Sequence, residues 1–329
     1  MNKLLLLALM LSNLSSAQIN EIREIEIYPE IITSDVLFKA NVKEVVSESF
    51  SYGDNKEKYE GISTWKYNKD KQLTEYTAHF GDSRFKTMYT YKDRLLVNVI
   101  KYEEEEGSTK FKKTEYLYNS KKALEKMTET DSDGNMIRMR KFEYKNESIY
   151  PFKIEEFDIP VFSDKISFKG YNLLEYDENQ SIIKNERYSE SDKPAWFSQS
   201  KYNGKFLIEK ELLGNTNEQN NSRISYKRDE RNRIIEKFLR GVLVSKDYYE
   251  GDLLIKYEEY RRDKVDVIVE YAYNKYRDII MKSVKNVSEG TKNVEVYTIK
   301  SDALGNQLEM KLEENGELVS SLKNKFVYY

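Results

Sequence analysis

The chain has 329 residues, and its 54 basic and 57 acidic side chains leave a net charge of only −3, or −4 without Lys3. This near-neutral balance excludes the strong positive field with which proteins attract nucleic acid or acidic membranes. The chain has no cysteine, which excludes disulfides and a lipid anchor on cysteine, and its 27 tyrosines are untypical of a disordered protein.

Residues 1–17 have the pattern of a secretory signal peptide. Lys3 forms a short positive region, and the apolar run from Leu4 to Leu11 is too short to span a bilayer as a helix. Small residues from Ser15 to Ala17 offer a cleavage site before Gln18. A buried first strand or helix is the alternative. We therefore expect an exported bacterial protein in the periplasm or outside the cell, with no membrane span after cleavage.

Aromatic residues recur at a nearly constant interval beyond residues 18–40, which we expect to form an N-terminal capping segment. The steps from Tyr67 to Tyr91, Tyr118 and Tyr144 are 24, 27 and 26 residues. A similar interval separates Tyr202, Tyr226, Tyr249 and Tyr273. A period near 25 residues indicates a repeat architecture, which we assign to residues 41–329.

Each repeat is predicted to be one β-hairpin, because the chain alternates between turns. In the segment 136–144, one face of a strand carries Met136, Arg138, Arg140, Phe142 and Tyr144, with charged residues on both faces. Asparagine or aspartate clusters follow many of the tyrosines, and a second turn, often with glycine, falls about halfway through each unit. Residues 147–175 contain Pro151 and Pro160, break the spacing and are expected to form an irregular insertion.

The predicted fold class is all-β. Hairpins joined end to end form an antiparallel meander of about twenty strands, and an open sheet of more than about ten strands tends to curl. We expect a single-layer twisted sheet or open shell, with tyrosines and aliphatic residues inside and charged residues outside. The alternative is a six-bladed β-propeller with four strands in each blade.

The turns resemble those of the YD-repeat family, also called Rhs repeats. The unit of that family begins with Tyr-Asp, two variable residues and then Gly-Arg-Leu. Tyr176-Asp177 followed by Gln180 and Ile182 is the nearest match, and the family's glycine is absent. The resemblance covers most of residues 60–300. It implies a coiled strip of β-hairpins at the cell envelope and no reaction.

The sequence contains no constellation that predicts catalysis, a metal site or a cofactor. His79 is the only histidine and lies beside a predicted turn, so we expect a solvated residue. The segment from Asp131 to Asn135 resembles the start of an EF-hand calcium loop, but Met136 occupies the position where that loop needs glycine. Pairs of carboxylates are too frequent here to indicate a glycosidase. We therefore expect a protein that is not an enzyme.

Exposed aromatic rings are the weak candidates for binding. Trp196 and Phe197 follow a polar loop, and Trp65 lies near a strand end, although packing in the core is the alternative for all three. We predict an exported structural or binding module that recognises a protein or polysaccharide, and not nucleic acid. The alternatives are a polysaccharide-acting hydrolase and an accessory or immunity partner of a secreted toxin.

Overall fold

The computed structural model describes residues 38, 41–53, 56–105, 108–146, 148–158, 167–214 and 222–329. The expected signal peptide, residues 1–17, lies outside the described residues. So does the expected capping segment 18–40, except for Phe38.

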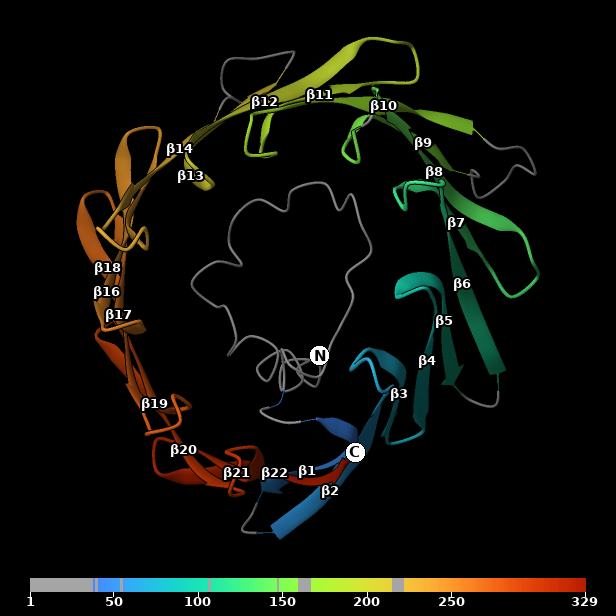
Figure 1. Ribbon diagram of the computed structural model, residues 1–329. Coiled ribbons are helices and arrows are strands. Elements are labelled where there is room, and N and C mark those ends of the chain that lie inside the picture. Colours follow the sequence, from blue (N-terminus) through green and yellow to red (C-terminus); the bar gives the residue numbers. More distant parts are fainter. Residues whose placement is uncertain are drawn as a thin grey trace. The chain divides into compact units, whose positions relative to one another are not determined.

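All twenty-two regular elements of the described chain are β-strands (Figure 1), which confirms the all-β prediction. They are β1 (Val42–Gly53), β2 (Lys56–Tyr67), β3 (Leu73–Phe80), β4 (Ser83–Lys92), β5 (Leu95–Glu105), β6 (Ser108–Tyr118), β7 (Leu124–Thr130), β8 (Met136–Tyr144), β9 (Pro151–Asp158), β10 (Ser167–Tyr176), β11 (Ile182–Tyr188), β12 (Pro194–Asn203), β13 (Phe206–Gly214), β14 (Ser222–Arg228), β15 (Ile234–Leu239), β16 (Val242–Glu250), β17 (Leu253–Arg261), β18 (Lys264–Tyr273), β19 (Ile279–Asn286), β20 (Thr291–Ser301), β21 (Gln307–Glu314) and β22 (Glu317–Tyr328). Across the described ranges, no helix has the length and apolarity needed to cross a membrane.

The chain divides into two compact units. The first comprises Met1–Phe111, Tyr249–Lys256 and Ile268–Tyr329, and the second comprises Lys112–Tyr248 and Tyr257–Val267. In the first unit, antiparallel pairing runs from β19 to β22, continues directly to β1, and then passes through β2 to β5. In the second unit it runs from β6 to β16 in chain order.

This pairing corrects two expectations about the sheet. A propeller interrupts its strand pairing after every fourth strand, whereas pairing is unbroken from β6 to β16 in the second unit, so the propeller alternative is wrong. In an open sheet, the first and last strands each have one unpaired edge. Here β1 and β22 pair with each other (Figure 1), with Val45 opposite Phe326. The open-shell prediction is therefore wrong at this point, because neither of these two strands is a free edge.

Residues 147–175 contain two paired strands where an irregular insertion was expected. β9 begins at Pro151, and Ile154 pairs with both Phe142 on β8 and Asn172 on β10. Proline is compatible with the first position of a strand, which is why the sequence misled the prediction here. Residues 159–166, between β9 and β10, lie outside the described part of the chain.

One type of turn recurs along the sheet. In the turn after Tyr176, the Asp177 side chain accepts the backbone N–H groups of Asn179 and Ser181 at 2.9 and 2.8 Å. Gln180 takes a left-handed conformation with φ of 68° and donates its N–H to the Asp177 carbonyl at 3.1 Å. The same side-chain pattern occurs in the turns that begin at Asn119, Asp131, Asp229, Asn274 and Asp302. Asparagine and aspartate thus fix these turns by binding their own backbone.

Tyrosine hydroxyls join neighbouring hairpins at these turns. The pairing register shifts by one residue just before Tyr144, and a bulge of this kind redirects the side chain that follows it. The Tyr144 hydroxyl then donates to the carbonyl of Leu124, the first residue of β7 after the turn that begins at Asn119, at 2.6 Å. Equivalent bonds link Tyr91 to Leu73, Tyr176 to Pro151, Tyr202 to Ile182 and Tyr273 to Leu254. We call this set the tyrosine ladder.

Arginine replaces tyrosine at one position of the ladder. Arg228 donates Nε and Nη2 to the Leu207 carbonyl at 3.0 and 2.8 Å. Burial raises the pKa of Tyr91 and that of Tyr273, so both phenols stay protonated and remain donors at neutral pH. This position therefore requires a side chain that is long enough to donate a hydrogen bond to the carbonyl.

The two faces of the sheet differ within the second unit. Phe142, Ile154, Leu174 and Ser198 are buried on one face, which we call the buried face. The opposite, charged face carries ion pairs such as those of Lys153 with Glu143 and Glu155, Lys184 with Glu175 and Glu186, and Lys201 with Glu209. Each exposed pair contributes at most about 1 kcal/mol to the free energy of unfolding. The orientation of the strands is therefore determined by burial of the side chains on the other face.

The tyrosines do not all lie with the buried residues, contrary to the expectation. Tyr171 and Tyr188 are on the charged face, where their rings stack at a centroid distance of 4.8 Å and an interplanar angle of 8°. In the first unit, the buried cluster consists of Val42, Val45, Tyr67 and Leu73, with Trp65 among the half-buried residues packed against it.

We expect Gly134→Ala to destabilise the protein by about 1 kcal/mol. Gly134 has φ of 82° with no atom near the position of a Cβ, so the cost comes from backbone strain alone. Gly53→Ala is the control, since Gly53 is equally uncrowded but not left-handed. The midpoints of urea unfolding provide the measurement, and equal midpoints for the two variants would contradict the strain.

Tyr144→Phe tests the tyrosine ladder. Loss of the hydroxyl leaves the carbonyl of buried Leu124 without this donor, which should lower the free energy of unfolding by about 1–2 kcal/mol. Tyr150→Phe is the control, because the Tyr150 hydroxyl has no hydrogen bond to the described residues while its ring packs against Tyr176. Denaturant titration of both variants measures the difference, and a similar loss in each would refute the ladder's contribution.

Candidate functional site

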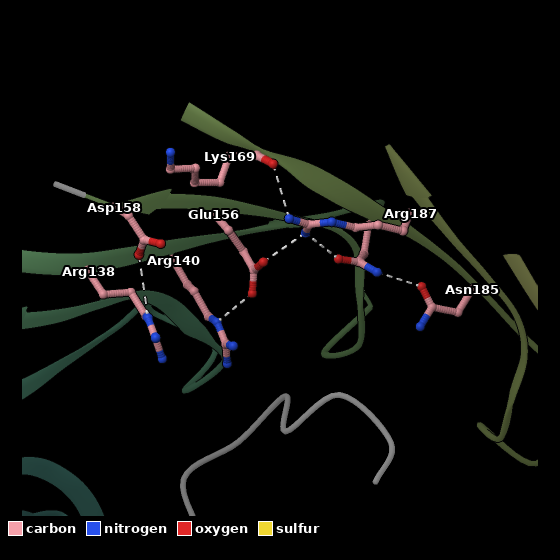
Figure 2. A network of polar contacts seen from close by, with 8 residues as sticks. Arg138, Arg140, Glu156, Asp158, Lys169, Asn185 and Arg187 are labelled. Atoms are coloured by element: carbon pink, nitrogen blue, oxygen red, sulfur yellow. Dashed lines mark hydrogen bonds and ion pairs between the residues drawn. The ribbon is translucent and has the colours of Figure 1, made fainter. Parts of the chain in front are cut away.

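A network of polar side chains crosses the buried face of the second unit on strands β8 to β11 (Figure 2). Charged groups are costly to bury and are retained only with partners, so such a group on this face marks a candidate site. We call it the arginine network, and it consists of Arg138, Arg140, Glu156, Asp158, Asn172, Asn185 and Arg187.

Glu156 is at the centre of the network. Its Oε1 accepts from Nε of Arg140 at 2.9 Å, and its Oε2 lies 2.8 Å from Nη1 of Arg187. Each carboxylate oxygen thus holds one guanidinium group, and charge-assisted bonds of this kind are short and directional. Glu156 therefore fixes the positions of two arginines from strands on either side of it.

Arg187 is held most firmly, with only 17% of its side chain exposed. Besides Glu156, it donates Nη1 to Oδ1 of Asn172 at 2.8 Å and Nη2 to the Lys169 carbonyl at 3.1 Å. Asn172 in turn donates to Oδ1 of Asn185 at 2.8 Å, and these two amides are 4% and 8% exposed. A satisfied buried chain of this kind is rigid, because breaking any link leaves an unpaired polar group.

A β-bulge at Lys169 supplies one of these acceptors. Phe168 pairs with Phe157 and Gly170 with Glu156, so Lys169 has no partner on β9 and its carbonyl accepts from Arg187. Gly170 has φ of 115°, and a Cβ there would lie 2.1 Å from the Tyr188 carbonyl oxygen. Only glycine fits this position, so the local sequence enforces the bulge.

Arg138 forms the open edge of the network. Its Nε lies 3.6 Å from Oδ1 of Asp158, and about half of each side chain is exposed. In Figure 2 the guanidinium groups of Arg138 and Arg140 point to the same side of the sheet. Within the described part of the chain, the Nη atoms of Arg138 and Arg140 have no hydrogen-bond partner. The network therefore fixes the positions of N–H donors that make no hydrogen bond to the described residues.

Trp196 is the predicted binding residue that the structure brings to this site. It lies on β12 directly opposite Arg187, so the two side chains share the buried face. Its partner on the other side, on β13, is Gly214. Trp196 is half-buried and stacks on no ring of the described residues. The half-buried indole of Trp196 therefore lies beside a fixed guanidinium on the same face.

The other two predicted residues lie elsewhere. Phe197 is adjacent in sequence and therefore on the charged face, opposite Glu186 and Leu213. Trp65 is on β2 in the first unit, where its ring contacts Tyr76 at 5.4 Å and packs against the buried cluster. Neither residue meets the arginine network.

The charged face of the same strands neutralises its groups internally. A hydrogen bond to Asp192 raises the pKa of Tyr171 to about 12, and a hydrogen bond to Glu155 raises the pKa of Lys153. The Lys153 amine also lies 5.1 Å from the centre of the Tyr171 ring. These groups are occupied with one another, which favours the buried face as the site.

No family model matches the chain, and no curated protein matches it. Solved structures that it resembles include a porin-like protein from Bacteroides uniformis, at 14% identity and a TM-score of 0.29, covering 92% of this chain and 100% of the other. A porin-like protein from Bacteroides vulgatus gives 9% identity and a TM-score of 0.20, with 88% and 99% covered. The TcdB2-TccC3 structure gives 10% identity and a TM-score of 0.39, covering 82% of this chain and only 20% of that chain. At these scores the likeness fixes no function.

Sequence reasoning missed every member of the arginine network. Alternation along 136–144 did place Arg138 and Arg140 on the same face as Phe142, and the ladder of β8 and β9 confirms that placement. Arginines on an otherwise apolar face were the available signal. Their partners Glu156 and Arg187 lie 16 and 47 residues beyond Arg140, so only the pairing of strands reveals the contacts.

Glu156→Gln should lower the free energy of unfolding by about 1–3 kcal/mol, because Arg140 and Arg187 lose the carboxylate that compensates their charge. Glu155→Gln is the matched control. It removes the same charge from the next residue, on the charged face, where the pair with Lys153 is worth at most about 1 kcal/mol. Denaturant unfolding compares the two, and losses of equal size would contradict the central position of Glu156.

Proposed function

We propose that the chain is an exported binding module of a bacterial envelope, and that it holds a polysaccharide on the arginine network beside Trp196. The observation that carries the proposal is the fixed guanidinium of Arg187, bound by Glu156, Asn172 and the Lys169 carbonyl, directly opposite the half-buried indole of Trp196. Export rests on the signal-like residues 1–17.

The chemistry of sugars suits this arrangement. A sugar ring offers an apolar C–H face and a rim of hydroxyls, and an aromatic ring provides apolar contact for the first. Rigid amide and guanidinium groups provide hydrogen-bond partners for the second. Since the network is already ordered by its own bonds, little side-chain entropy is lost on binding. A polysaccharide fits this combination better than a protein partner does.

Hydrolysis is not part of the proposal. A glycosidase needs one carboxyl group that carries a proton and a second that is free to react. At this site both oxygens of Glu156 are bound by guanidinium groups, and Asp158 lies beside Arg138. The two carboxylates are therefore better suited to holding arginines than to acid–base chemistry.

We also propose that the array is a degenerate form of the YD-repeat unit. The support is the turn after Tyr176, in which Asp177 binds the backbone and Gln180 is left-handed. Gln180 occupies the position of the family's glycine, the residue that adopts this conformation most easily.

Trp196→Ala tests the proposed function. In affinity gel electrophoresis against neutral and acidic polysaccharides, we expect the wild-type protein to be retarded by at least one polymer. Removing the indole should weaken binding to that polymer about tenfold or more, as loss of about 1.4 kcal/mol or more of stacking and apolar contact would do.

Phe197→Ala is the control, because it removes a ring of similar size from the adjacent residue on the charged face. Its binding should stay within about twofold of the wild type. Retardation by no polymer, or equal losses in the two variants, would refute the proposal, and pull-down of a protein partner would then decide for the alternative.

A further inference from the structure

The charges of the arginine network do not cancel. Three guanidinium groups, of Arg138, Arg140 and Arg187, face two carboxylates, of Glu156 and Asp158. Each carboxylate oxygen of Glu156 contacts one guanidinium group, that of Arg140 or that of Arg187. Oδ1 of Asp158 lies 3.6 Å from Nε of Arg138. One positive charge therefore remains without a counter-charge within the network, in a chain whose net charge is −3.

The unused donors belong to two neighbouring arginines. Arg138 and Arg140 are two residues apart on one strand face, about 7 Å from each other. Arg140 engages Glu156 through Nε, which leaves its Nη atoms without a partner among the described residues. The planar guanidinium binds carboxylate or sulfate oxygens with two parallel hydrogen bonds, so this pair suits an anionic group.

Trp196 lies four strands away from Arg140, a distance of about 19 Å along the sheet. A ligand that contacts both the indole and the arginine pair must be longer than a single sugar. The Asn172 and Asn185 amides and the Arg187 guanidinium lie between them on the same face. The site is therefore an extended track with an aromatic residue at one side and cationic donors at the other.

We propose that the ligand is an acidic polysaccharide, and that Arg138 and Arg140 bind its carboxylate or sulfate groups. This inference rests on the proposed function and adds the charge of the ligand to it. Arg187 is a positioning residue in this arrangement, since its Nη1 and Nη2 atoms are held by Glu156, Asn172 and the Lys169 carbonyl. Binding should weaken as salt screens the exposed Arg138.

Three cellulose derivatives with one backbone separate charge from sugar recognition. We would measure binding of hydroxyethylcellulose, carboxymethylcellulose and cellulose sulfate by affinity gel electrophoresis. We expect the wild-type protein to bind at least one charged polymer about tenfold or more tightly than the neutral one. Preference for carboxymethylcellulose would identify a carboxylated ligand, and preference for cellulose sulfate a sulfated one.

Arg138→Gln/Arg140→Gln should reduce that preference to less than about threefold. Arg84→Gln/Arg94→Gln is the control, because it removes the same charge from exposed residues of the first unit whose partners are Glu104 and Asp70. Arg138→Gln alone provides a milder variant, since this side chain is half-exposed and only loosely paired. Circular dichroism checks that each variant folds.

The outcomes distinguish the inference from the proposed function. Trp196-dependent binding with no charge preference overturns the inference alone, as does an equal loss of preference in the two double variants. Charge-selective binding that depends on Arg138 and Arg140 but is indifferent to Trp196→Ala supports the anionic site and overturns the sugar-stacking function. Binding of none of the three polymers overturns the inference, and the wider polysaccharide panel then decides the function.

Discussion

The hydrogen bond from a tyrosine hydroxyl to the carbonyl beside the preceding turn is the interaction on which the architecture depends. A sheet one layer deep has little volume in which to bury apolar groups, and a turn at its end leaves backbone groups without ladder partners. The bond of Tyr144 to the Leu124 carbonyl satisfies one such group and ties two hairpins together. Arg228 performs the same task with a different side chain, which shows that the constraint is the unsatisfied carbonyl.

The arginine network applies the same principle on the buried face. Glu156 could not be placed there without Arg140 and Arg187, and Arg187 could not be placed there without Asn172 and the freed Lys169 carbonyl. The bulge enforced by Gly170 is thus a condition for the polar site. The candidate site therefore depends on Gly170, a residue without a side chain.

The sequence contained the hairpin pattern but not the contacts between hairpins. Alternation predicted the face of Arg138 and Arg140, and the repeat predicted strands and turns at the tyrosines. Trp196 and Phe197 were predicted together as binding residues, and only the pairing of Arg187 with Trp196 shows that Trp196 lies on the face of the polar network. The prolines concealed β9, since Pro151 starts a strand rather than breaking one.

The pairing of β1 with β22 has a consequence for how the chain is made. Tyr52 and Ser321 share a hydrogen bond at 3.1 Å although they are 269 residues apart, and Ser321 is almost completely buried. One side of β1 lacks its neighbour until synthesis has passed β22 (Glu317–Tyr328). Contacts so distant in sequence form slowly, and an unpaired strand can join the wrong chain in the meantime.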